Sequence, residues 1–203
     1  NQKEAQWMKR LQIIDSTTIT LFSNLLFKGV GRHPKTGKKK GGIKVHTVIH
    51  ANEEVPSDIR FTSAATNDSF MLNPATLNKG DIMAMDRAYI DYEKFEQMTQ
   101  RGTTYVTKMK NNLEYSIQND TIYRTLNGLM EMRIQSVSFC KQLKDRETLT
   151  HRARIITYVD EKKHKLISLL TNDMESDPLE ITQFIANAGK LNCCSSKSSR
   201  TSH

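Results

Sequence analysis

The chain has 203 residues, of which 37% are hydrophobic and 26% are charged. This balance is typical of a globular protein with one sizeable core, and it excludes a disordered chain. No window approaches the roughly 18 apolar residues of a membrane-spanning helix, so we expect no membrane partner. The first ten residues contain no apolar signal-peptide core. Because residue 1 is not Met, we expect an N-terminal part to precede it.

The charge and the cysteine content indicate the kind of binding partner and the cellular compartment. The net charge of +8 favours a polyanionic partner, because Lys and Arg side chains release counterions when they bind phosphates. A basic protein without such a partner remains the alternative. The three cysteines, Cys140 and the pair Cys193 and Cys194, form neither a disulfide framework nor a zinc-ligand spacing. A reducing cytoplasm is the simplest compartment.

The first half of the chain mixes strands with helices. β-branched runs and apolar alternation predict strands at residues 7–20, 43–50, 55–62, 81–86 and 103–109, and capping residues with apolar faces predict helices at residues 67–77 and 91–100. Between the first two strands, residues 28–42 are basic and rich in glycine, which predicts a mobile loop.

The second half is richer in strands. Apolar runs separated by polar turns predict strands at residues 122–126, 132–139, 153–159 and 165–170. Asp177 is then placed to cap a final helix that has Pro178 in its first turn. This mixed order indicates an α/β layer fold.

Two aspartates carry the candidate chemistry. Asp15 follows an apolar strand, and Asp86 ends another short apolar strand. Two strand-end carboxylates that converge on one sheet edge offer the hard oxygen ligands that Mg²⁺ prefers. Two such ions can activate a nucleophile and stabilise the leaving oxygen of a phosphodiester. For either Asp taken alone, an ordinary turn residue is the better interpretation.

Four separated segments resemble one family. LQIIDSTTI, GGIKVHTVIH, MDRAYIDYEKFEQM and GTTYVTKMK, in this order, are similar to bacterial insertion-sequence transposases of the insertion-sequence-four group, which are DDE (Asp-Asp-Glu) enzymes. The resemblance implies an α/β fold: a ribonuclease-H-like mixed sheet flanked by helices, with a β-rich insertion before the last catalytic helix. The expected division is a first core part at residues 1–110, the insertion at residues 111–172, and the last helix with an aberrant, disordered tail at residues 173–203.

The resemblance also implies activity, cofactor and partners. These transposases cleave and join DNA with Mg²⁺ or Mn²⁺, so we expect double-stranded DNA, both element ends and target, as the partner. A homodimer in the DNA complex and a bacterial, nucleoid-associated location in the cytoplasm follow from the same likeness. Asp15 and Asp86 match the family's first two catalytic, metal-binding carboxylates. Weaker matches are Arg87 and Tyr89, expected to contact DNA phosphates or to hold the site, and Lys44, Lys108 and Lys110, expected to meet DNA. The basic loop at residues 35–40 either meets phosphates or is an ordinary solvated loop. His46 is more often structural at such a position.

The third carboxylate of the family is missing from the chain. That Glu normally lies in a helical pattern Y-x2-R-x3-E-x6-K, whereas residues 181–203 read ITQFIANAGKLNCCSSKSSRTSH, without an evident helical apolar stripe. Codons can be chosen for residues 182–203 so that a reading frame starting one base earlier encodes a different peptide. That peptide is AIYRKRWEIELLFKQIKQNFT, which contains the whole pattern. The lost Glu codon then overlaps those of Leu191 and Asn192, and Glu180 lies about three helical turns too early to replace it.

The sequence therefore predicts a transposase catalytic domain whose end is frameshifted or truncated and whose activity is doubtful. The alternative is a non-catalytic remnant that binds DNA or inhibits intact subunits. A ribonuclease-H-like nuclease of another lineage is disfavoured by the segment that follows Met85.

Overall fold

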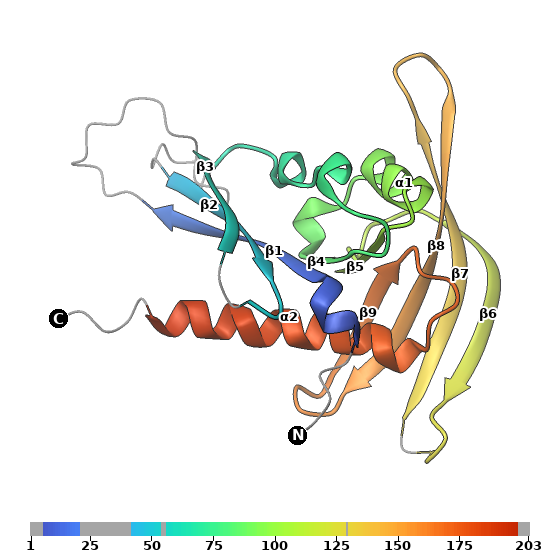
Figure 1. Ribbon diagram of the computed structural model, residues 1–203. Coiled ribbons are helices and arrows are strands. Elements are labelled where there is room, and N and C mark those ends of the chain that lie inside the picture. Colours follow the sequence, from blue (N-terminus) through green and yellow to red (C-terminus); the bar gives the residue numbers. More distant parts are fainter. Residues whose placement is uncertain (1–5, 21–41, 54–55, 129, 199–203) are drawn as a thin grey trace.

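A nine-stranded mixed sheet organises the molecule (Figure 1). The computed structural model describes residues 6–20, 42–53, 56–128 and 130–198; the predicted loop at residues 28–42 falls almost wholly outside them. The strands are β1 (Leu11–Thr20), β2 (Gly42–His50), β3 (Pro56–Ser63), β4 (Ile82–Met85), β5 (Thr104–Lys108), β6 (Ser116–Arg124), β7 (Glu131–Gln142), β8 (Thr148–Asp160) and β9 (Lys165–Thr171). The helices are the 3-10 turns η1 (Gln6–Arg10), η2 (Asp68–Met71), η3 (Pro74–Thr76) and η4 (Arg87–Tyr89), and the α-helices α1 (Tyr92–Gln100) and α2 (Pro178–Ser198).

The strand order is β3-β2-β1-β4-β5-β9-β8-β7-β6. Strands β1, β4 and β5 are parallel neighbours, whereas β2 and β3 form antiparallel hairpin partners at one side. On the other side β9 pairs antiparallel with β5, so the β-rich segment continues the core sheet. The expected fold class, a ribonuclease-H-like mixed sheet flanked by helices, is confirmed.

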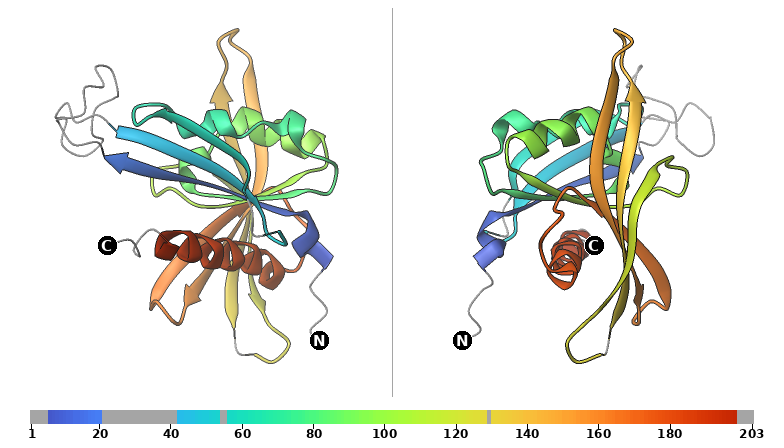
Figure 2. Two further views of the ribbon diagram at one scale, coloured as in Figure 1. Left: turned by 60° about the vertical axis from the view of Figure 1, so that its left-hand side comes forward. Right: turned by 90° about the vertical axis from the view of Figure 1, so that its right-hand side faces the viewer.

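Helices cover both faces of the central strands. Helices α2 and η1 lie on one face, and α1 with η2, η3 and η4 lies on the other (Figures 1 and 2). Strand β4 is buried along its whole length, with Ile82 and Ala84 in the core beneath α2 and Met83 and Met85 in the core beneath α1. A short, wholly apolar strand is what a central parallel position between two helical layers requires.

One predicted helix is wrong. Residues 67–77 form two separate 3-10 turns, η2 and η3, in place of a single helix. Pro74 explains the break, because it lacks an N–H and disfavours the helical conformation of the residue before it. The side chains of Asn67 and Asn73 cap the two turns by accepting bonds from the backbone N–H groups of Ser69 and Ala75.

Helix α2 also differs from its prediction. Asp177 caps it as expected, with its carboxylate accepting a bond from the backbone N–H of Leu179 at 2.9 Å. The expected loss of an apolar face after Glu180 is wrong, because Ile181, Phe184 and Ala188 are all buried. Their spacing of three and four residues is that of one helical face, which the surrounding polar residues concealed in the sequence. The helix extends to Ser198, whereas we predicted disorder from residue 195.

A buried polar chain joins α1 to the β-rich strands. The hydroxyl of Tyr105 lies 2.5 Å from Nε2 of His151, and Nδ1 of His151 lies 2.6 Å from the carboxylate of Glu96. Burial lowers the pKa of His151 more than Glu96 raises it. A neutral ring fits both contacts, because its Nδ1–H donates to Glu96 while Nε2 accepts from Tyr105.

Candidate active site

Asp15 and Asp86 lie beside each other at the centre of the sheet. Strands β1 and β4 run parallel and in register as far as Ile14 and Met85, and the next residue on each is the aspartate. Strand β4 ends there, and Asp86 turns the chain into η4. Asp15 lies within β1, which continues beside β2 to Thr20, so it is not the strand-end residue that the predicted carboxylate pair assumed. The aspartates therefore project where one strand outruns its neighbour.

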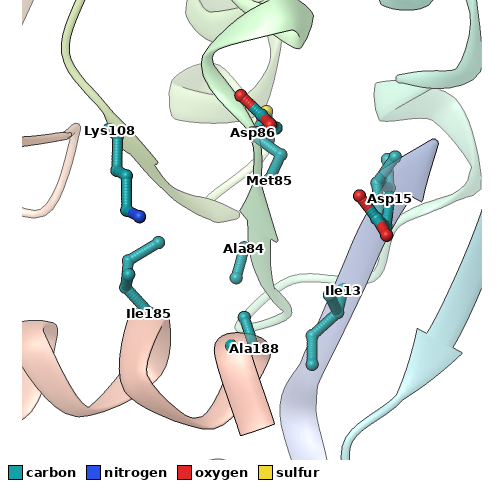
Figure 3. Close-up of a pocket in the computed structure, with 10 residues that line it drawn as sticks. Ile13, Asp15, Ala84, Met85, Asp86, Lys108, Ile185 and Ala188 are labelled. Carbon is teal, nitrogen blue, oxygen red and sulfur yellow. The ribbon is translucent and has the colours of Figure 1, made fainter. Parts of the chain in front are cut away.

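Both aspartates line a small pocket of about 120 Å³. Figure 3 shows them at its rim, with Lys108 of β5 on the other side of Asp86 from Asp15. The opposite wall comes from α2, which contributes Ile185, Ala188 and Gly189. Residues distant in sequence thus meet where β1, β4, β5 and α2 converge.

The electrostatics of the pocket favour a cation. Burial raises the pKa of Asp15, the backbone N–H of Ser16 lowers it, and the charge of Asp86 raises it again. Partial burial and the charge of Asp86 thus destabilise the ionised form of Asp15, and a bound cation would stabilise it. Hard carboxylate oxygens on adjacent strands fit Mg²⁺ or Mn²⁺ as part of an ion's ligand set.

Comparison with known proteins identifies the family. Residues 6–187 match the family described as "Transposase DDE domain". The chain belongs to this family.

Curated relatives of this DDE domain are transposases of insertion sequences. The chain is 23% identical over 181 residues to the "Transposase for insertion sequence element IS231F" of Bacillus thuringiensis subsp. israelensis, a match covering 85% of this chain and 36% of that protein. It is 26% identical over 113 residues to the "Probable transposase for insertion sequence element IS5377" of Geobacillus stearothermophilus, covering 56% and 28%. A 26% identity over 136 residues links it to the IS231E transposase of Bacillus thuringiensis subsp. finitimus, covering 64% and 27%. The chain thus spans about a third of these relatives' length.

Tyr89 of the DDE domain is not placed to meet DNA. Its side chain is completely buried, which contradicts the DNA contact and leaves the other expected role, holding the site. Its hydroxyl bonds the side chain of Ser16 and lies 3.4 Å from Nδ1 of His46, whose Nε2 lies 2.8 Å from the hydroxyl of Thr62. Burial lowers the pKa of His46, so the ring is neutral. The network stands behind the aspartate pair and joins β1, β2 and β3 to η4.

Lys44 is likewise engaged inside the domain. Its ammonium group lies 2.7 Å from the carboxylate of Asp68 and donates to the carbonyl of Thr66 at 3.0 Å. The side chains of the ion pair are only 15% and 10% exposed. The pair fixes η2 against β2, and this fixed role replaces the DNA contact expected of Lys44.

The other three predicted cations lie near the site and near one another. Arg87 and Lys108 are exposed, and Lys110 is partly exposed. All three line a second, larger cavity of about 720 Å³, and Lys108 lines the aspartate pocket as well. The loop at residues 35–40 lies outside the described residues.

No third carboxylate accompanies the aspartates among the residues that the structure describes, since no group of three His, Cys, Asp or Glu side chains is gathered there. The sequence holds no Asp or Glu after Glu180. The α2 wall, with Ile185, Ala188 and Gly189, was missed from the sequence, although an apolar spacing of three and four residues was the signal for it. In the same described part, no helix is long and apolar enough to cross a membrane.

Proposed function

We propose that this domain descends from an insertion-sequence transposase of the insertion-sequence-four group, in which Asp15 and Asp86 bind a catalytic divalent ion. The observation that carries the proposal is their in-register placement on adjacent parallel strands inside a pocket. The resemblance of four separated segments supports the group. A bound Mg²⁺ or Mn²⁺ supplies charge stabilisation and activation of a nucleophile for phosphodiester cleavage and strand transfer.

The roles of the chain's own residues follow from their positions. Asp15 and Asp86 supply oxygen ligands, and the buried hydroxyl of Tyr89 bonds Ser16, the residue next to Asp15. This contact holds the end of the β1–β4 pairing in place. Lys108, at the rim of the pocket, is positioned to attract the phosphate that reacts there.

We further propose that the chain as written lacks catalytic activity because its third carboxylate is lost through a shift of reading frame. Residues three and four apart share one face of an α-helix. Ala188 and Gly189 of α2 line the pocket, and position 192 follows them in the sequence by four and three residues. With the chosen codons, the shifted frame places its Glu codon across Leu191 and Asn192, which supports position 192 as the place of the lost carboxylate.

The alternative function is a DNA-binding or inhibitory remnant without catalysis. An incomplete carboxylate set beside a basic cavity favours it for this chain. In either case the proposed partner is double-stranded DNA, bound by a homodimer in the bacterial nucleoid.

Titration with Mn²⁺, followed by electron paramagnetic resonance, tests the proposed ion site. The unaltered chain is expected to bind Mn²⁺ weakly, and Asp15→Asn and Asp86→Asn are each expected to abolish that binding. Asp58→Asn is the matched control, because Asp58 is partly exposed on β3 and pairs only with Arg60 among described residues. Equal Mn²⁺ binding by all four proteins would remove the aspartates from the site.

A further inference from the structure

Strand β3 forms one edge of the sheet, on the side opposite β6 (Figure 1). Within the part of the chain that the structure describes, only β2 pairs with it, so the backbone N–H and C=O groups on its outer side can bind another strand. Proteins protect such edges with lysines, prolines or bulges. Strand β3 contains no lysine, and Pro56 and the register shift between Pro56 and Asp58 affect only its first residues. Residues 58–63 therefore form a regular edge that is open to pairing.

Two large apolar side chains of β3 are exposed. Ile59 is 51% exposed and Phe61, two residues later on the same face of the strand, is 70% exposed. Ile59 lies opposite Thr47 of β2, and Thr47 lies opposite Asp15 of β1, so this is the sheet face on which α2 lies. Helix α2 packs mainly on β1, β4 and β5. The apolar side chains at the β3 edge thus remain uncovered by any described helix, which is typical of a surface that binds a partner.

The charges of β3 are self-complementary. Asp58 and Arg60 flank Ile59 and form a solvent-exposed ion pair of 3.0 Å along the strand. When two copies of β3 pair antiparallel about a two-fold axis at Ile59, Asp58 of each copy lies opposite Arg60 of the other. The same register places the two Ile59 side chains opposite each other, with Phe61 in the diagonal position beside Ile59 of the second copy. An axis at Arg60 would instead place two arginines opposite each other.

The other edge of the sheet lacks this complementarity. The charged side chains of β6, Asp120 and Arg124, form ion pairs with Arg133 and Glu131 of the neighbouring strand β7. A register shift also interrupts β6 between Ile117 and Asn119. Both features disfavour the addition of a further strand to β6, so the complementarity is a property of β3.

We propose that β3 is a docking surface for a second copy of this chain, with the two β3 strands joined antiparallel about Ile59 into one continuous sheet. Each copy contributes the same residues, as a two-fold interface requires. Only a few side chains of each copy are buried, so the dimer is weak. Its formation requires neither DNA nor metal, which goes beyond the DNA-bound homodimer proposed above.

Sedimentation equilibrium measures the dimer, and hydrogen–deuterium exchange locates its interface, both in EDTA without DNA. As the protein concentration rises from roughly 10 μM to 1 mM, the range expected for a small interface, the average mass should approach that of a dimer. Exchange should slow over the same range in residues 56–63 and stay constant in residues 116–124. Strand β6 is the matched control, because it is the other edge and exposes Ile117 and Ile122 to a similar extent.

Charge exchange tests the register. Asp58→Arg alone and Arg60→Asp alone each place like charges opposite each other in the homodimer, and each should weaken it on the order of tenfold. An equimolar mixture of these two variants should dimerise as well as the unaltered chain, because a cationic strand then faces an anionic one. Both substitutions in one chain should also restore the homodimer. Rescue in either form shows that the variants are folded.

An apolar variant completes the test. Phe61→Ser should weaken the dimer on the order of tenfold, whereas Ile122→Ser on β6 should leave it unchanged. A monomer at every concentration, an equal effect of Ile122→Ser, or slowed exchange in β6 in place of β3 would overturn the proposal. So would a β3 that is already protected at the lowest concentration, because another segment of the same chain would then cover it. Failure of the Asp15 and Asp86 ion site leaves these outcomes unchanged, since no metal is present.

Discussion

Phe184→Ala tests whether α2 is packed on the sheet as described. Phe184 is 2% exposed and meets Trp7 edge-on, with ring centroids 4.8 Å apart. A buried phenylalanine hides about 150 Å² or more, which at about 25 cal/mol per Å² corresponds to about 4 kcal/mol. Phe→Ala changes in protein cores cost about 3–5 kcal/mol. We expect the free energy of unfolding to fall by about 4 kcal/mol, a large part of the roughly 5–15 kcal/mol typical of a domain.

Urea unfolding followed by tryptophan fluorescence measures this change. Trp7 is the single tryptophan of the chain, so its emission reports on the contact that the variant removes. With an m-value of about 2.5 kcal/mol per M, the unfolding midpoint should drop by about 1.5 M, and the native emission should shift to the red. Gln183→Ala, at an exposed position of the same helix, should change stability by less than about 0.5 kcal/mol. A loss below about 1 kcal/mol for Phe184→Ala would show that α2 is not packed against Trp7.

Two further predictions concern charged groups. The raised pKa of Asp15 means that the native state holds a proton more tightly than the unfolded state does, so this group lowers stability as the pH rises above its ordinary pKa of 3.8. Asp15→Asn should therefore raise the melting temperature near pH 7, and the gain should shrink as the pH falls toward about 4; a constant gain across this range would contradict the reasoning. Asp68→Ala should cost about 3 kcal/mol in urea unfolding because it leaves the largely buried Lys44 unpaired, whereas Asp58→Ala, in a pair whose side chains are 57% and 40% exposed, should cost less than about 1 kcal/mol. Equal costs would show that the Lys44 pair is solvated.

Much of the core was predictable because local patterns and tertiary packing agree there. The apolar run before Asp86 correctly predicted strand β4, and the alternation in residues 43–50 correctly predicted strand β2. Strand β6 was placed too late, since its first half is polar and exposed and thus carries no burial signal. The predicted helix at residues 67–77 is broken at Pro74, because the local backbone constraint of proline outweighs the apolar pattern there.

The site was only partly predictable for a different reason. Asp15 and Asp86 were identified by their residue type after apolar strands, but which strands are neighbours is a property of topology. Tyr89 and Lys44 were assigned to DNA as weaker matches to the family, yet one is buried and the other forms an internal ion pair. Burial of this kind depends on segments distant in sequence, so a local pattern does not reveal it.

The central claim is that Asp15 and Asp86 form an ion site whose third ligand belongs on α2 at position 192. Mn²⁺ affinity of the Asn192→Glu variant tests it most directly, with Ala186→Glu, on an exposed position of the same helix, as the matched control. The account predicts that Asn192→Glu binds Mn²⁺ on the order of tenfold more tightly than the unaltered chain, a gain of about 1.4 kcal/mol that Asp86→Asn should abolish. Affinity unchanged by Asn192→Glu, or an equal gain from Ala186→Glu, would contradict it.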